Sequence, residues 1–286
     1  MAKVRATPKS STSAGCDDPW RIPDTLWERI EPLLPPRPAH PLGCHNPRVS
    51  DRRAMDAIFF VLRTGCQWNA LNATGICSSS SAHRRFQEWT AAGVFVTFWA
   101  QGLQEYDELK GLDWSWLAMD GAMTKAPLGG ERTGRNPTDR GKLGTKRSLL
   151  TEAAGVPVGL AVEGANRHDK ILAEATLESI PVDRPEPTAE RPQGMCLDKG
   201  YDYDDTRELV REFGFTAHVR TRGEETRALE REAGYKARRW VVERTHSWMN
   251  RFRRILIRWE KKVENYFGLL HLVCGWITYR CSGLLG

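Results

Sequence analysis

Two aspartates of this chain stand where a metal-binding carboxylate is often found. Asp120 follows the apolar run WLAM, Asp198 follows MCL, and each precedes a glycine within two residues. We expect both runs to be strands, because a strand end fixes an acidic side chain and glycine leaves room for a ligand beside the backbone. A single aspartate at a strand end usually just begins a turn. Two such acids on adjacent strands would converge, and divalent cations would offset their repulsion.

A third acid, Glu243, lies inside a long helix predicted over residues 237–258. Apolar side chains recur there at steps of four and three and predict the face that packs on the sheet: Val241, Thr245, Trp248, Phe252, Ile255 and Trp259. Glu243 points away from that face, on a ridge with Arg239, Asn250 and Arg254. An ion pair with Arg239 would contribute only a few tenths of a kcal/mol. The alternative hypothesis makes Glu243 a metal ligand among bases that hold phosphates.

The positive charge of the chain is concentrated in two stretches. The formal net charge is +6; residues 125–147 carry seven bases against two acids, and residues 236–262 carry ten against two. Charge focused in this way favours a polyanion such as nucleic acid, although a solvated helix face and a loop would give the same pattern. The candidate DNA contacts in the two stretches are Lys142, Lys146, Arg147, Arg239, Arg251 and Arg254.

Residues 20–110 predict a helical region. Asp24 is the expected N-cap of one helix, and Ser50 opens a second helix that ends at Gly65. A short helix (QWNAL), a Ser/Gly loop and a third helix (AHRRFQEWTAAG) follow, which is the order of a helix-turn-helix module. Arg84, Arg85 and Gln87 on the third helix are candidates for reaching phosphates or base edges. Many small helical domains without a DNA partner share this pattern.

Residues 111–286 predict a mixed sheet with flanking helices. A strand ends at Asp120, a basic loop follows, and SLLTEA and VPVGLAVEGA form a hairpin around Gly155. Asp169 is the expected cap of the next helix, which precedes the strand that ends at Asp198. A helix, a strand and the helix of Glu243 complete the order of a ribonuclease-H-like fold, of class α+β or α/β with five strands. We therefore predict a disordered tail over residues 1–19, a helical DNA-binding domain over 20–110 and a catalytic domain over 111–286.

Five segments of the chain resemble the DDE transposases of bacterial insertion sequences, in the family numbered five within the superfamily numbered four. They are LAMDGAMTKAPLGG, PTDRGKLGTKRSLLTEAAGVPVG, GANRHDKILAEATL, LDKGYD and RRWVVERTHSWMNRFRRI. The resemblance implies a ribonuclease-H-like domain in which Asp120, Asp198 and Glu243 are the catalytic and metal-binding triad.

The superfamily also has a Tyr-x2-Arg-x3-Glu-x6-Lys signature around its glutamate. Arg239 and Glu243 fit its spacing here, whereas Lys236 stands at the Tyr position and Asn250 at the Lys position. Arg251 and Arg254 are candidates to replace that final lysine in holding a phosphate.

The resemblance also implies the chemistry and the partners. Two Mg²⁺ ions roughly 3.5–4 Å apart, or Mn²⁺ in their place, would clamp the attacking and leaving oxygens of an in-line displacement. Water attacks first and the DNA 3′-OH second, with no covalent protein–DNA intermediate. The expected partner is double-stranded DNA, both the terminal inverted repeats of the element and the target, bound by a homodimer that holds two ends together. His168 and Asp169 in NRHDK are either extra site residues or simply a loop residue and a helix cap.

The composition excludes several other classes of protein. With 286 residues, 40% hydrophobic and 27% charged, the chain is neither disordered nor a membrane protein. The first residues have no apolar stretch and the seven cysteines form no CxxC pair, so we expect a bacterial cytoplasmic, nucleoid-associated protein without a zinc knuckle. Two alternatives to the transposase stay open: a transposase-derived DNA-binding protein without catalysis, and a metal-dependent nuclease without strand transfer.

Overall fold

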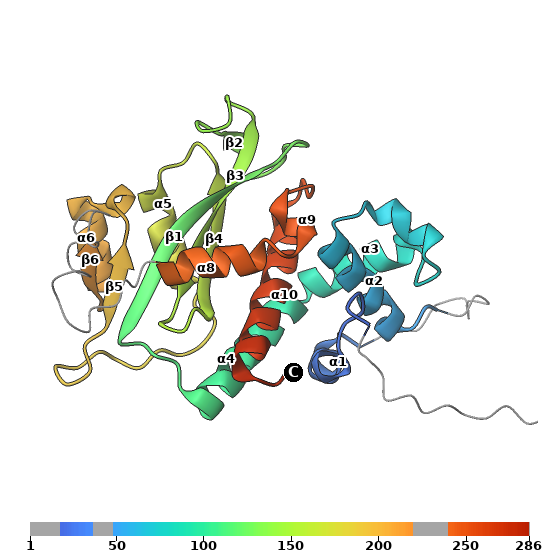
Figure 1. Cartoon of the computed structure of the whole chain (residues 1–286), viewed down its shortest axis with the longest axis horizontal. Helices are drawn as coiled ribbons and strands as arrows, with labels where there is room; N and C mark the ends of the chain where they lie inside the picture. Colours follow the sequence, from blue (N-terminus) through green and yellow to red (C-terminus); the bar gives the residue numbers. More distant parts are fainter. Residues whose placement is uncertain (1–17, 37–47, 220–239, 286) are drawn as a thin grey trace, which may run out of the picture.

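The computed structural model describes residues 18–36, 48–219 and 240–285. Within these ranges a mixed sheet is flanked by helices, and a cluster of helices from the first part of the chain lies at one end of the molecule (Figure 1). The predicted tail over residues 1–19 falls almost wholly outside them. Over the same ranges no helix is both long and apolar enough to cross a membrane.

The helical region begins and ends its elements largely as the sequence predicts. Its elements are α1 (Asp24–Ile30), η1 (Glu31–Leu33), α2 (Asp51–Thr64), η2 (Trp68–Ala73), α3 (Ser79–Ala91) and α4 (Val94–Lys110). The Ser50 side chain accepts a hydrogen bond from the Arg53 N–H and caps α2, and Gly65 ends that helix in the left-handed conformation. Asp24 is not an N-cap: Pro23 occupies that position, and the Asp24 carboxylate pairs with Arg52 at 2.6 Å.

The sheet contains six strands in the described residues rather than the predicted five. They are β1 (Trp116–Lys125), β2 (Gly134–Arg135), β3 (Leu143–Thr151), β4 (Pro157–Gly164), β5 (Gly194–Leu197) and β6 (Thr216–Val219). Their order is β2-β3-β1-β5-β6, with β4 also on β3; β5 and β6 run parallel to β1, and the other pairs are antiparallel. The additional strand, β2, lies in the basic stretch predicted as a loop, because its backbone pairs with the start of β3.

The remaining helices of the described residues include the three that the sequence predicts and a long helix over residues 263–282 that it does not predict. They are α5 (Asp169–Glu178), η3 (Lys199–Tyr201), α6 (Asp204–Glu212), α8 (Trp240–Met249), α9 (Arg253–Leu256) and α10 (Val263–Ser282). The single helix predicted over residues 237–258 is wrong, because α8 ends at Met249 and the chain is extended at Phe252 before α9 begins. The Phe252 ring packs edge-on against Phe59 and Trp276, at centroid distances of 6.5 and 5.2 Å, and this burial outweighs continuation of the helix.

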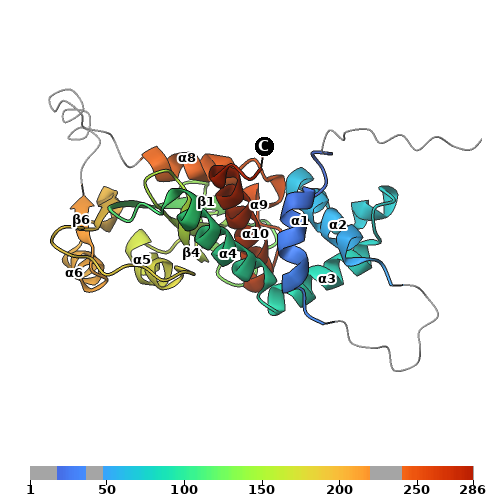
Figure 2. The ribbon, with the colours of Figure 1, turned by 90° about the horizontal axis from the view of Figure 1, so that it is seen from below.

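The helical region and the sheet share one hydrophobic core, centred on α4 and α10 (Figure 2). A Cβ on Gly102 of α4 would lie only 2.9 Å from the Tyr279 ring of α10, so glycine permits this close approach. The Trp99 indole N–H donates to the Pro157 carbonyl at 3.0 Å and fastens α4 to β4. Helix α4, which was not predicted from the sequence, is therefore what joins the two parts of the molecule.

Candidate active site

Asp120 lies in the middle of β1, the central strand of the sheet. The parallel register that pairs Trp116 with Gly194 and Ala118 with Cys196 brings Asp120 level with Asp198, immediately beyond the end of β5. The two aspartates are thus on neighbouring strands, as the sequence predicts. Asp120 does not end its strand, however, because β3 continues to pair with β1 as far as Lys125.

Asp198 is held by the turn that follows β5. Its Oδ1 accepts a hydrogen bond from the Gly200 N–H at 2.7 Å, and the side chain is half-buried. A Cβ on residue 200 would lie 2.8 Å from that oxygen, so a larger residue would push the carboxylate aside. Gly200 therefore orients the Asp198 carboxylate.

Glu243 is brought to these aspartates by α8, which packs over β1 and β3 (Figure 1). His246, one turn further along α8, is buried, and its Nε2 lies 3.3 Å from the Asp120 carbonyl oxygen, to which it donates. The exposed Glu243 lies on the same side of the helix, because residues three apart are neighbours on a helix surface. His246 was not identified from the sequence, although its position three residues after Glu243 could have indicated that it lies on the same side of the helix.

The electrostatics of the site are dominated by carboxylates. Burial, together with the smaller effects of the negative charges of Asp198, Glu243 and Asp169, raises the pKa of Asp120 to about 7, against the opposing effect of a backbone hydrogen bond. Burial lowers the pKa of His246 to about 3, with the charge of Arg147 acting in the same direction. His246 is therefore neutral at pH 7 and does not offset the acids.

These acids have the donor chemistry of a divalent-cation site but not yet its spacing. Carboxylate oxygens are the ligands that Mg²⁺ prefers. In the described part of the chain, no set of three or more His, Cys, Asp or Glu side chains forms a ready-made metal-binding group. Mutual repulsion of the carboxylates adds to the effect of burial in raising the pKa of Asp120. A bound cation would draw them together.

Lys146 and Arg147, expected to contact DNA, are instead buried in β3. The Lys146 ammonium pairs with Asp169 at 3.1 Å, and the Arg147 guanidinium donates to Asn250 Oδ1 at 2.9 Å. Asn250, which stands at the family's lysine position, is thus the acceptor for a buried arginine. The protein partners of Lys146 and Arg147 argue against a role in DNA contact.

Arg85 and Arg254 are also buried and engaged with protein groups. Arg85 bonds to Glu88 at 3.0 Å and lies 3.6 Å from Asp51, whereas Arg254 pairs with Glu260 at 2.7 Å. Contrary to the prediction from the sequence, neither arginine is positioned to contact DNA. Of the other candidates, Arg84, Lys142 and Arg251 are exposed, Gln87 is half-buried, and Arg239 lies outside the described residues.

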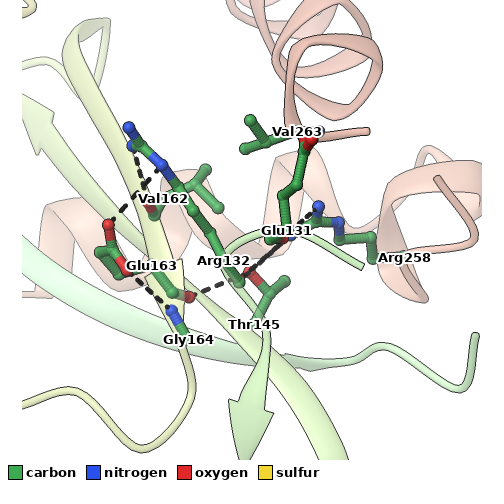
Figure 3. Close-up of polar contacts among 8 residues, drawn as sticks. All are labelled: Glu131, Arg132, Thr145, Val162, Glu163, Gly164, Arg258 and Val263. Carbon is green, nitrogen blue, oxygen red and sulfur yellow. Dashed lines mark hydrogen bonds and ion pairs between the residues drawn. The ribbon is translucent and has the colours of Figure 1, made fainter. Parts of the chain in front are cut away.

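The basic hairpin around β2 is fastened to the segment before α10 by Arg258 (Figure 3). The buried Arg258 guanidinium donates to the carbonyl oxygens of Glu131 at 2.7 Å and Arg132 at 3.2 Å. In the same cluster, the Glu131 carboxylate accepts a hydrogen bond from the Val263 N–H at 2.9 Å, and Arg132 pairs with Glu163. This anchorage fixes the base of a hairpin whose other strand, β3, begins just after the exposed Lys142.

An arginine cluster that the sequence did not predict surrounds Arg251. Arg251 and Arg280 line a cavity of about 220 Å³ together with Trp248 and Trp276. The Arg63 and Arg280 guanidinium groups both lie over the Trp276 ring, and burial and the charges of Arg251 and Arg280 lower the pKa of Arg63. None of the ion pairs within the described ranges involves these three arginines. A phosphate would relieve their repulsion.

The sheet brings Asp120 beside Asp198, and Glu243 lies on a helix packed over the same sheet. Comparison with known proteins identifies the class of protein. The family described as "Transposase DDE domain" matches residues 115–277, and that described as "Putative transposase of IS4/5 family" matches residues 22–99. The chain belongs to the IS4/5 transposases, which confirms the resemblance drawn from its sequence.

Two curated relatives come from Burkholderia cepacia. The chain is 34% identical to the putative transposase for insertion sequence element IS402 over 53% of its own length and 71% of the relative. It is 36% identical to an IS402 uncharacterized 16.2 kDa protein, over 41% of its own length and 80% of that protein. A pre-cleavage Mos1 transpososome structure is 11% identical, with a TM-score of 0.29 over 87% of this chain and 82% of that one, a likeness too distant to carry an argument.

Proposed function

We propose that this transposase binds the terminal inverted repeats of its own insertion sequence and catalyses Mg²⁺-dependent cleavage and strand transfer. The active site would be ribonuclease-H-like, with Asp120, Asp198 and Glu243 as its catalytic residues. The observation that carries the proposal is the concentration of negative charge at Asp120, whose pKa is raised by burial and by carboxylates on three other elements. Like charges held close together destabilise a fold, so their presence at one place favours a functional site.

The triad would hold Mg²⁺, or Mn²⁺ in its place, through hard oxygen ligands. When bound, such ions would polarise the scissile phosphodiester and stabilise the charge that develops on its oxygens. The chain's own contribution is to orient the acids. The Gly200 N–H fixes Asp198, and the His246 contact with the Asp120 carbonyl sets the position of α8, and hence Glu243, on β1.

The DNA would be held by exposed bases on both parts of the molecule. The order α2-η2-α3 suits a helix-turn-helix module, with Arg84 and Gln87 on the outer side of α3. Lys142 on the basic hairpin and the arginine cluster at Arg251 would contact phosphates of the element or of the target. Because transposition requires two ends to be held together, we propose a homodimer on DNA, acting in the bacterial cytoplasm.

The deciding experiment uses the full chain, a supercoiled plasmid that carries the element's ends, and Mg²⁺. Excision followed by joining to a target is expected. Nicking without joining would instead identify a nuclease, and binding of the terminal repeats without cleavage would identify a DNA-binding protein derived from a transposase.

Two substitutions test the triad in the same assay. Asp198→Ala and Glu243→Gln should abolish cleavage while binding of the terminal repeats stays nearly intact, because the DNA contacts lie elsewhere on the molecule. Asp205→Asn is the matched control, since Asp205 is an exposed acid on α6 that pairs with Lys170 at 2.8 Å. Cleavage retained in either triad variant would contradict the assignment.

A further inference from the structure

Asp169 was expected to cap α5, but the structure gives its carboxylate another position. The N-cap of α5 is His168, and Asp169 is the first helical residue without a capping role. Its carboxylate lies directly over Gly121, the residue that follows Asp120, so that a Cβ at position 121 would collide with Asp169 Oδ1. The chain therefore requires glycine at position 121 to admit this acid beside β1.

The two carboxylate oxygens of Asp169 have different surroundings. Oδ1 lies 3.1 Å from the Lys146 ammonium, which is buried and also donates to the Arg167 carbonyl at 2.8 Å. Oδ2 lies 3.6 Å from the position of a Cβ on Gly200, and Asp198 Oδ1 lies 2.8 Å from the same position. One oxygen is thus held by a cation, and the other is turned toward Asp198.

Asp169 reaches the site from the face of the sheet opposite Glu243. Ser148 on β3 pairs with Gly121 and bonds to Thr176 of α5, so this face carries α5. Its neighbour Arg147 bonds to Asn250, just past the end of α8, on the other face, because successive strand residues alternate. Beside Asp120 the neighbouring strand β5 has already ended at Leu197, so on that side of β1 no β5 residue separates the acids of the two faces.

The ion pair with Lys146 accounts for the position of Asp169 Oδ1, but it does not account for the orientation of Oδ2 toward Asp198. A third like charge next to Asp120 and Asp198 is unfavourable by itself. A cation bound between these acids would turn the same arrangement into a favourable one. Asp169 also retains partial access to solvent, with 27% of its side chain exposed.

We propose that Asp169 is a fourth carboxylate of the cleavage site, which binds a divalent cation together with Asp120 and Asp198, and that Lys146 positions it. This inference rests on the proposed function, since it adds a residue to the same metal site. Lys146 acts only through Asp169, by holding Oδ1 so that Oδ2 faces Asp198.

The test measures Mn²⁺ binding by the full chain without DNA. The concentration of free Mn²⁺ is measured from its electron paramagnetic resonance signal. Asp169→Asn keeps the shape and an acceptor for Lys146 but removes the charge. We expect it to weaken Mn²⁺ binding about tenfold to a hundredfold, the range typical of groups that support a metal site. Asp205→Asn, the exposed acid on α6, is expected to bind Mn²⁺ as the parent does. Far-UV circular dichroism and the thermal midpoint establish that each variant is folded.

Gly121→Ala gives a second, independent variant, because the added methyl group must displace the Asp169 carboxylate. It should weaken Mn²⁺ binding, and the double variant with Asp169→Asn should be little weaker than either single variant, since both act on one group. An additive loss would show that Gly121→Ala acts through Asp120 instead and would remove this support.

Unchanged Mn²⁺ affinity in Asp169→Asn would overturn the inference. If Asp120→Asn and Asp198→Asn lose Mn²⁺ while Asp169→Asn does not, only the fourth carboxylate is wrong. If all three variants bind Mn²⁺ like the parent, the metal site of the proposed function fails as well.

Discussion

Replacing Asp120 with asparagine should abolish activity and yet stabilise the fold at neutral pH. The carboxyl group is half-buried, and its pKa rises from 3.8 to about 7 on folding because of burial and, secondarily, the charges of Asp198, Glu243 and Asp169. Asparagine keeps the size of the side chain but carries no charge. The substitution therefore removes both the cost of burying a charge and the smaller repulsion from the other acids, without leaving a cavity.

The sign and size of the effect follow from proton linkage. Between pH 3.8 and about 7 the folded protein keeps a proton on Asp120 that the unfolded chain loses, so stability falls as the pH rises. At 1.36 kcal/mol per pH unit the full difference is on the order of 4 kcal/mol, of which about 3 kcal/mol lies between pH 5 and pH 8. The asparagine variant lacks this loss. The free energy of unfolding of the variant, relative to the parent, should therefore increase by about 3 kcal/mol from pH 5 to pH 8.

Urea unfolding followed by circular dichroism in EDTA, at several values from pH 5 to pH 8, measures this difference. Asp205→Asn is the control; hydrogen bonding to Lys170 lowers the pKa of Asp205, so its removal should give no growing advantage. Addition of Mg²⁺ should shrink the advantage of Asp120→Asn, because a bound cation relieves the same repulsion in the parent. A stability difference between Asp120→Asn and the parent that stays constant over the whole interval would refute the reasoning.

Three further predictions concern buried and clustered arginines. Arg258→Leu should lower the free energy of unfolding by about 3–5 kcal/mol, because it leaves buried carbonyls without their donor. The control Arg253→Leu, on the exposed side of α9, should change the free energy of unfolding little. Equal effects of the two substitutions in urea unfolding would contradict this prediction. Asn250→Lys, which restores the family signature, should destabilise the fold by replacing the acceptor of Arg147 with a second cation, and a higher thermal midpoint would disprove it. Arg280→Gln should weaken DNA binding and reduce the salt dependence of the binding constant by about one phosphate contact. Fluorescence anisotropy at several salt concentrations measures both. An unchanged slope of the binding constant against salt would exclude the arginine cluster from the DNA interface.

Much of the fold could be predicted because its signals are local. The Ser50 cap and the glycine stop of α2 depend on backbone groups within a few residues, and both are confirmed. The hairpin around Gly155 is likewise confirmed, with a left-handed φ of 91° at that glycine. The nearness of Asp120 and Asp198 was predicted from the apolar run before each acid and is confirmed, because the parallel register of β1 and β5 places the two acids level with each other.

What the sequence by itself determined is therefore the cap and end of α2, the hairpin around Gly155 and the two aspartates that follow apolar strand residues, because caps, turns and apolar patterns act over short stretches of chain. Only the tertiary structure decided which charged side chains face solvent. Arg147 is buried because Asn250, 103 residues away, accepts its hydrogen bond, and Lys146 is buried because Asp169 and the Arg167 carbonyl meet its ammonium. A charge can leave water only where partners from distant segments converge on it. No pattern within a short stretch of sequence shows that convergence, and for this reason bases that look alike in the sequence become either buried residues with protein partners or exposed residues.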